Sequence, residues 1–166
     1  MSKQTVINSL EFAEKSLQIH GRITPFDLGR LADTLHDRDG ELRYTLNGGI
    51  DQQGKPQLEL QVQGKLNLVC QRCLGAVEWP LDVITWFVLV ASEDMMPAPE
   101  DEQDEVDTLV ADPHLCVESL VEDEVLLGLP LAPTHEVEDC AVNLSVAHEQ
   151  KESPFKLLQG LKLGKN

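Results

Sequence analysis

The sequence predicts a mixed α+β protein, and three patterns in its 166 residues carry that prediction. Apolar residues recur at helical spacing within residues 9–35. Along 58–70 apolar and polar residues alternate strictly, which is the period of a half-buried strand. A second helical pattern follows Cys116 and must end by Pro130, because proline disfavours a helical residue before it. Helices and strands grouped in separate parts of a chain indicate helices packed on an antiparallel sheet.

We expect two helices near the N-terminus. The first, over residues 9–19, places three apolar side chains on one face after Ser9, a residue type that caps helices well. The second, over 24–35, begins with Thr24 as N-cap and Pro25 at the first helical position, where a proline lacking its N–H costs nothing.

Four segments are typical of strands. Residues 41–51 alternate until an Asn-Gly-Gly turn signal, and 58–70 alternate with one interruption at Gly64 that favours a bulge or bend. Residues 77–90 become almost continuously apolar, which predicts a more fully buried strand. Residues 106–112 predict a short strand. The strands are expected to form one antiparallel sheet on which the helix before Pro130 packs.

The net charge of −16 limits the classes of partner. A chain this acidic lacks the basic face of a general RNA-binding module. Its charge favours basic protein partners or serves solubility alone, and charge by itself favours the second interpretation. Eight acidic residues and no basic one lie between 93 and 107, so we expect an acidic mobile loop over about 92–105. Two interpretations of this loop stay open: a solvated surface, or a binding segment for a basic partner.

The predicted organisation is a single α+β domain over 1–140, followed by a polar tether and a C-terminal amphipathic helix over 141–166. The N-terminus has no signal-peptide pattern and no apolar run is long enough to span a membrane, so we expect a cytoplasmic protein without membrane contact. The final helix either docks into a partner's groove or folds back on its own domain. Its candidate partner-binding residues are Pro154, Phe155, Leu158 and Leu161.

Cys70 and Cys73 form a CxxC pair that could hold a metal. A zinc site needs four ligands, and the natural second pair is His135 and Cys140 in the stretch PTHEVEDC. Zinc is the one candidate cofactor, and such a site would clip two distant segments together. Two reduced cysteines in a core are the competing interpretation, since a cytosolic protein keeps its thiols reduced. A redox pair is disfavoured because the residues after Cys73 are typical of a strand rather than a helix.

An enzyme is not predicted. Glu122, Asp123 and Glu124 are adjacent on the expected helix and point in different directions, so we interpret them as its solvated face. The chain shows no glycine-rich phosphate loop and no nucleophile beside a base. Cys116 has no partner at ligand spacing and is interpreted as a small buried apolar residue.

Taken together, four stretches resemble the YceD family of large ribosomal RNA subunit accumulation proteins. They are HGRITPFDLGRLADTL at 20–35, CQRCLG at 70–75, VEDEVLLGLPLAPTHEVEDC at 121–140 and SPFKLLQGLK at 153–162. The likeness covers nearly the whole chain. It departs at Cys116, where relatives tend to have an acidic helix cap, so the helix is expected to start a turn earlier at Asp112-Pro113.

The resemblance implies a bacterial cytoplasmic factor that supports synthesis, processing or stability of 23S ribosomal RNA. The resemblance carries no established enzymatic activity. We therefore expect a non-enzymatic adaptor to a basic ribosomal protein or large-subunit assembly factor, with ribosomal RNA contacted directly or indirectly. A zinc-dependent RNA-processing or modifying enzyme and a general RNA-binding module are the alternatives. The positions matching family motifs are Cys70, Arg72, Cys73, Glu122 to Glu124, Leu126, Leu127, Leu129, Pro130, His135, Cys140, Pro154, Phe155, Leu158 and Leu161.

Overall fold

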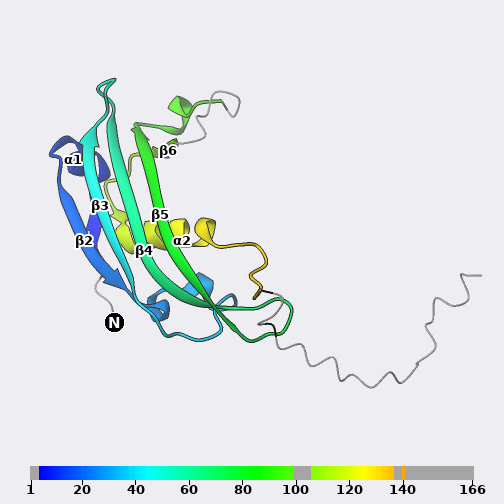
Figure 1. Cartoon of the computed structure of the whole chain (residues 1–166). Coiled ribbons are helices and arrows are strands. Elements are labelled where there is room, and N and C mark those ends of the chain that lie inside the picture. Colours follow the sequence, from blue (N-terminus) through cyan, green and yellow to red (C-terminus); the bar gives the residue numbers. More distant parts are fainter. Residues whose placement is uncertain (1–3, 99–105, 137–139, 141–166) are drawn as a thin grey trace, which may run out of the picture.

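The computed structural model describes residues 4–98, 106–136 and 140, and its centre is a curved five-stranded sheet (Figure 1). The strand order is β2-β3-β4-β5-β6, so each strand lies beside its neighbour in sequence. The bounds are β2 Gln18–Ile23, β3 Leu42–Ile50, β4 Pro56–Val69, β5 Ala76–Val90 and β6 Val106–Val110. The ladders from β2 to β5 are antiparallel, as expected, whereas β6 runs parallel to β5.

Short elements complete the described part of the chain. Two-residue strands β1 and β7 pair antiparallel, and helix α2 crosses one face of the sheet (Figure 1). None of the helices in the described residues is long and apolar enough to cross a membrane. The bounds are β1 Val6–Ile7, α1 Ser9–Glu14, η1 Pro25–Asp27, η2 Gly29–Leu31, η3 Glu93–Met95, β7 Leu115–Cys116 and α2 Val117–Gly128, where η marks 3₁₀ turns.

The predicted pair of N-terminal helices is wrong. The first shrinks to α1, which Asn8 caps by accepting the Glu11 backbone N–H at 3.1 Å, and the rest of 9–19 leads into β2. A short isolated helix is marginal, and pairing with all six residues of β2 favours the strand instead. The second helix is replaced by η1 and η2, because the chain leaves helical geometry at Leu28, where ψ is 74°.

The core lies between one face of the sheet and the helices. Leucines from the neighbouring strands β3 and β4, among them Leu42, Leu46 and Leu60, are fully buried there. Helix α2 adds Val117 and Val121, which are also fully buried. Each such side chain contributes about 1.5–3 kcal/mol of hydrophobic stabilisation. This Leu- and Val-rich layer holds the sheet in place, and the ends of β4 and β5 position the site described below.

Strand β5 is less buried than the sequence predicted. Its side chains alternate, so that Phe87 and Leu89 enter the core while Ile84 and Trp86 are 55% and 36% exposed. The reason is that α1 and α2 pack against the core face of the sheet. An almost continuous apolar run therefore marks a strand with apolar residues on both faces, not a strand covered on both faces.

Gly64 does not create a bulge. Both ladders of β4 keep their register through it, with Leu42 and Leu81 as its partners on either side. Its φ of +156° and a close approach explain the glycine, since a Cβ there would lie 2.5 Å from the Glu41 carbonyl oxygen. The predicted strand is confirmed, and the interruption in its pattern marks a tight backbone contact.

Helix α2 confirms the second helical pattern but begins at Val117, not at Asp112-Pro113. Cys116 is the N-cap, is half-buried and makes no side-chain capping bond. In place of a cap, Glu118 in the first turn accepts the Thr5 backbone N–H at 2.8 Å and so ties the N-terminal segment to α2. Residues 99–105 of the expected acidic loop lie outside the described part of the chain.

The acidic run on α2 is not a solvated face. Glu122 accepts two hydrogen bonds from Arg30, one from the backbone N–H and one from Nε, both at 2.8 Å. Arg30 Nη1 also donates to Asp123 at 2.5 Å, which fastens the η2 segment to the helix. Glu124 is only 5% exposed and accepts the Thr85 hydroxyl at 2.5 Å. Only Asp123 of the three has a half-exposed side chain.

Burial raises the pKa of Glu124, and the nearby Asp107 and Asp123 raise it further, while Thr85 lowers it. A carboxyl group whose pKa is higher in the folded than in the unfolded protein stabilises the fold while it is protonated. This contribution is lost as the pH rises and the group ionises. The free energy of unfolding of the Glu124→Gln variant is therefore expected to rise relative to that of wild type as pH increases from about 4 to 7. Urea unfolding of both proteins across this range checks it. Glu14→Gln, the same substitution at an exposed position of α1, is the control, and a pH-independent difference between Glu124→Gln and wild type would contradict the expectation.

Candidate metal centre

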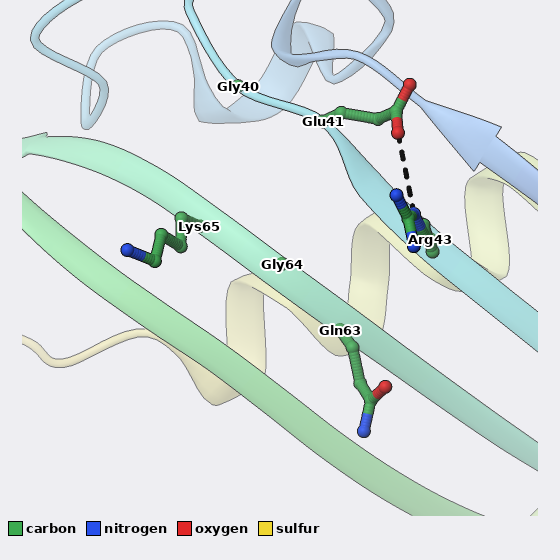
Figure 2. Close-up of a pocket in the computed structure, with 6 residues that line it drawn as sticks. All are labelled: Gly40, Glu41, Arg43, Gln63, Gly64 and Lys65. Atoms are coloured by element: carbon green, nitrogen blue, oxygen red, sulfur yellow. Dashed lines mark ion pairs between the residues drawn. The ribbon is translucent and has the colours of Figure 1, made fainter.

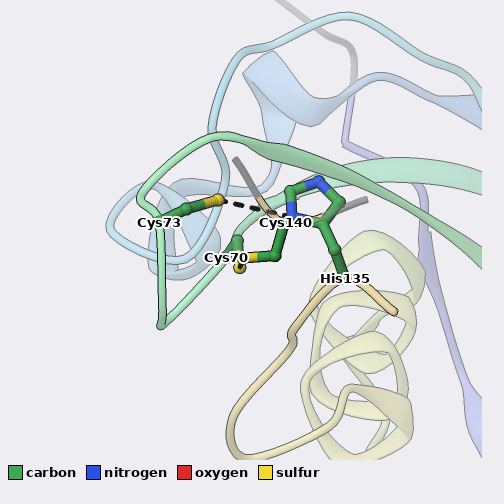
Figure 3. Close-up of side chains that lie close together, drawn as sticks. All are labelled: Cys70, Cys73, His135 and Cys140. Carbon is green, nitrogen blue, oxygen red and sulfur yellow. Dashed lines mark hydrogen bonds between the residues drawn. The ribbon is translucent and has the colours of Figure 1, made fainter. Parts of the chain in front are cut away.

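Four side chains from two separate parts of the chain meet beside the end of the sheet. Cys70 follows β4 directly, Cys73 lies in the turn before β5, and His135 and Cys140 follow α2. The sulfur atoms and a His135 ring nitrogen all lie within 4.8 Å of one another, and Figure 3 shows them converging. All four residues that the sequence suggested as metal ligands are thus brought together.

The turn between β4 and β5 presents the two cysteines of CxxC. The Cys70 N–H donates to the Gly75 carbonyl and the Leu74 N–H donates to the Cys70 carbonyl, each at 2.9 Å. Leu74 adopts a φ of +61°, a conformation that costs a non-glycine residue about 1–2 kcal/mol. The Gln71 N–H also donates to the Pro133 carbonyl at 2.8 Å, which holds the turn against the segment that carries His135.

The spacing of the ligand atoms fits a tetrahedral zinc ion. Bond lengths of about 2.3 Å to sulfur and 2.0–2.1 Å to nitrogen give tetrahedral edges of about 3.8 Å between sulfurs and 3.6 Å between sulfur and nitrogen. The Cys70 and Cys140 sulfurs are 3.9 Å apart, and Cys73 Sγ lies 3.4 Å from His135 Nδ1. These two of the six separations match those edges closely, and the other four are no longer than 4.8 Å.

Neighbouring groups orient the ligands as they do around known metal sites. His135 Nε2 donates to the Ala76 carbonyl at 2.7 Å, which leaves Nδ1 as the ring atom that faces Cys73. Arg72 Nε donates to Cys140 Sγ at 3.0 Å, and its Nη2 donates to the His135 carbonyl at 2.8 Å. The role of Arg72 as a clamp on the second ligand pair could not be derived from spacing alone.

The electrostatics around Cys70 favour its thiolate form. Burial of Cys70 raises its pKa, but hydrogen bonds from backbone N–H groups, led by that of Cys73, outweigh it and lower the pKa to about 5. The hydrogen bond to the Ala76 carbonyl raises the pKa of His135, and the two nearby cysteines add to this. Since the thiolate is the metal-binding form of cysteine, these hydrogen bonds prepare Cys70 to be a ligand.

Three cysteines and one histidine are a donor set that structural zinc sites use. Three thiolates and one imidazole fill all four positions of a tetrahedral ion, whereas a catalytic zinc keeps one position for water or substrate. The CxxC turn also leads into β5, not into a helix, so it lacks the arrangement of a dithiol oxidoreductase. Cys116 lies outside the cluster. The candidate partner-binding residues Pro154, Phe155, Leu158 and Leu161 lie outside the described residues.

A hollow on the sheet surface is a weaker candidate. It is lined by Gly40, Glu41, Arg43, Gln63, Gly64 and Lys65 (Figure 2). Glu41 Oε1 lies 3.5 Å from Arg43 Nε, and Lys65 Nζ lies 2.7 Å from Glu78. Because these charges pair with one another, we assign no ligand to this hollow.

The fold and the cluster define a class: a mixed α+β protein in which a Cys₃His cluster joins the sheet to the segment after its main helix. The model of the large ribosomal RNA subunit accumulation protein YceD family matches residues 58–162, and the chain belongs to this family. The large ribosomal RNA subunit accumulation protein YceD of Haemophilus influenzae is 27% identical over 172 residues, which cover 94% of each protein. No solved structure matches the chain.

Proposed function

We propose that the chain is a non-enzymatic cytoplasmic factor that supports accumulation of large-subunit ribosomal RNA. In this proposal a zinc ion links the turn between β4 and β5 to the segment that follows α2. The observation that carries the proposal is the family match, which includes all four clustered residues within 58–162. Bound zinc would supply a rigid cross-link between segments 62 residues apart in sequence, from Cys73 to His135.

The charge of the chain supports an adaptor. With a net charge of −16, it would bind a basic ribosomal protein or assembly factor more readily than the phosphates of RNA. Contact with RNA, if it is direct, would fall to residues 151–166, which hold four lysines and one acidic residue. A general RNA-binding module would need a basic face instead. A zinc-dependent RNA-modifying enzyme would need an open metal position, which the donor set does not provide.

A sucrose gradient of growing cells tests this function. Tagged protein is expected to co-sediment with immature large subunits, and deletion of residues 151–166 is expected to release it to the top of the gradient. The triple variant Phe155→Ser, Leu158→Ser and Leu161→Ser should act like the deletion, whereas Gln159→Ser should not. Wild-type protein confined to the top of the gradient would refute docking on the ribosome and favour an indirect effect on ribosomal RNA.

A further inference from the structure

One apolar patch lies on the sheet face opposite α2, on its last two strands. We call it the β5–β6 patch. Ile84 and Trp86 are 55% and 36% exposed, and the other members are half-buried. The pairing of Trp86 with Val106 and of Val90 with Val110 makes the patch continuous across both strands. Its members are Ile84, Trp86, Val88, Val90, Val106 and Val110.

The patch contrasts with the strand beside it. On β4 the residues paired with Val88, Trp86 and Ile84 are Gln57, Glu59 and Gln61, which suit a solvent-facing surface. Apolar residues on this face are thus concentrated on β5 and β6. Exposed tryptophan beside β-branched residues is typical of protein interfaces, where a large rigid side chain contributes much of the binding energy.

The charge of the surrounding chain indicates which partner the patch fits. Residues 73–150 contain nineteen Asp and Glu and no Lys or Arg, while residues 1–72 contain nine of each kind. The net negative charge therefore belongs to the part of the chain that forms β5, β6 and α2, and the acidic residues of α2 lie on the opposite face of the sheet from the patch. Glu59 pairs opposite Trp86, Asp82 precedes Ile84 on the same face, and Glu93 is exposed just beyond β5.

We propose that the β5–β6 patch is the docking surface for a basic polypeptide segment of a large-subunit protein. Apolar side chains of the docking segment contact Ile84 and Trp86, and Lys or Arg side chains of the same segment pair with Glu59 and Asp82. RNA is disfavoured because neither β5 nor β6 has a basic residue, and a second copy is disfavoured because two equally acidic faces repel. That the partner is a large-subunit protein rests on the proposed function. That the docking segment carries both basic and apolar side chains rests on the patch and the acidic residues beside it.

The test places a photo-cross-linking amino acid, benzoylphenylalanine, at position 84 of the full-length protein. The matched control places it at Ile50, the same residue type in a strand, 47% exposed and at the end of β3. Each protein is irradiated with total protein extracted from purified large ribosomal subunits, and cross-linked peptides are identified by mass spectrometry. A parallel sample receives purified large-subunit RNA.

Position 84 is expected to cross-link to a Lys- and Arg-rich segment at least about tenfold more than position 50, since an anchored hot-spot side chain carries 1.4 kcal/mol or more. Cross-linking should fall when salt is raised above about 0.3 M, and in the Glu59→Gln, Asp82→Asn double variant. Cross-links to RNA, to a second copy, to residues 141–166 of the same chain, or equal signals at both positions would each overturn the proposal. If the protein still co-sedimented with large subunits, the proposed function would survive that failure.

Discussion

Untagged protein purified without chelator is expected to contain about one zinc ion per chain, and Cys73→Ser is expected to abolish it. Removing the Cys73 thiolate leaves three ligands, Cys70, His135 and Cys140, and breaks the CxxC pair. Three ligands bind a tetrahedral ion less tightly than four. Metal content by inductively coupled plasma mass spectrometry, on protein of measured concentration, gives the stoichiometry directly.

Loss of zinc should weaken the fold without abolishing it. The leucine-rich core of the sheet includes none of the four ligands. Zinc that is held at a concentration about 1,000-fold above its dissociation constant contributes about 4 kcal/mol. For a chain of this length that corresponds to a fall in melting temperature of about 10 °C. Circular dichroism of wild type with and without chelator, and of Cys73→Ser, measures it.

Cys116→Ser is the matched control, because it removes the one cysteine outside the cluster. It should keep its zinc and respond to chelator as wild type does. Metal-free wild-type protein whose melting temperature is unchanged by added zinc would refute the zinc proposal. The two reduced cysteines of the competing interpretation would then remain, packed beside His135.

The sequence was sufficient to predict the four-ligand cluster and the main strands. Alternation along residues 58–70 marks β4 because a half-buried strand faces the core on every second residue. The cluster could be inferred because the chemistry of zinc limits ligands to a few residue types, and the stretch PTHEVEDC after the CxxC offers two of them, His135 and Cys140. Such inferences depend on local periodicity or on ligand identity, both of which are visible without a structure.

The predictions that the structure contradicts concern features that depend on contacts between residues distant in sequence. Leu17 continues the apolar face of α1, yet residues 18–23 become β2 because β3 offers them a hydrogen-bonded partner. Glu124 looked solvated, but Thr85 lies across from it on the sheet and allows its burial. The parallel pairing of β6 was equally hidden, since no local pattern distinguishes a parallel edge strand from an antiparallel one.

Gly48→Ala is expected to destabilise the protein by about 3 kcal/mol, because it forces apart two layers of the core. A Cβ at Gly48 would lie 2.4 Å from the Phe12 carbonyl oxygen and 2.9 Å from the Ala13 Cα, both in α1. These atoms are backbone and cannot rotate away, so α1 must move off β3. The fall in melting temperature should be about 6–12 °C, measured by differential scanning calorimetry.

Gly49→Ala is the matched control, one residue further along the same strand. Its Cβ would meet only Gln57 Nε2 at 3.9 Å, an ordinary contact, so its effect should stay within about 0.5 kcal/mol. Equal losses in the two variants would mean that glycine serves strand flexibility here and not helix packing. A loss confined to Gly48→Ala would show that the six-residue α1, too short to be stable by itself, holds its place because β3 presents a residue without a side chain.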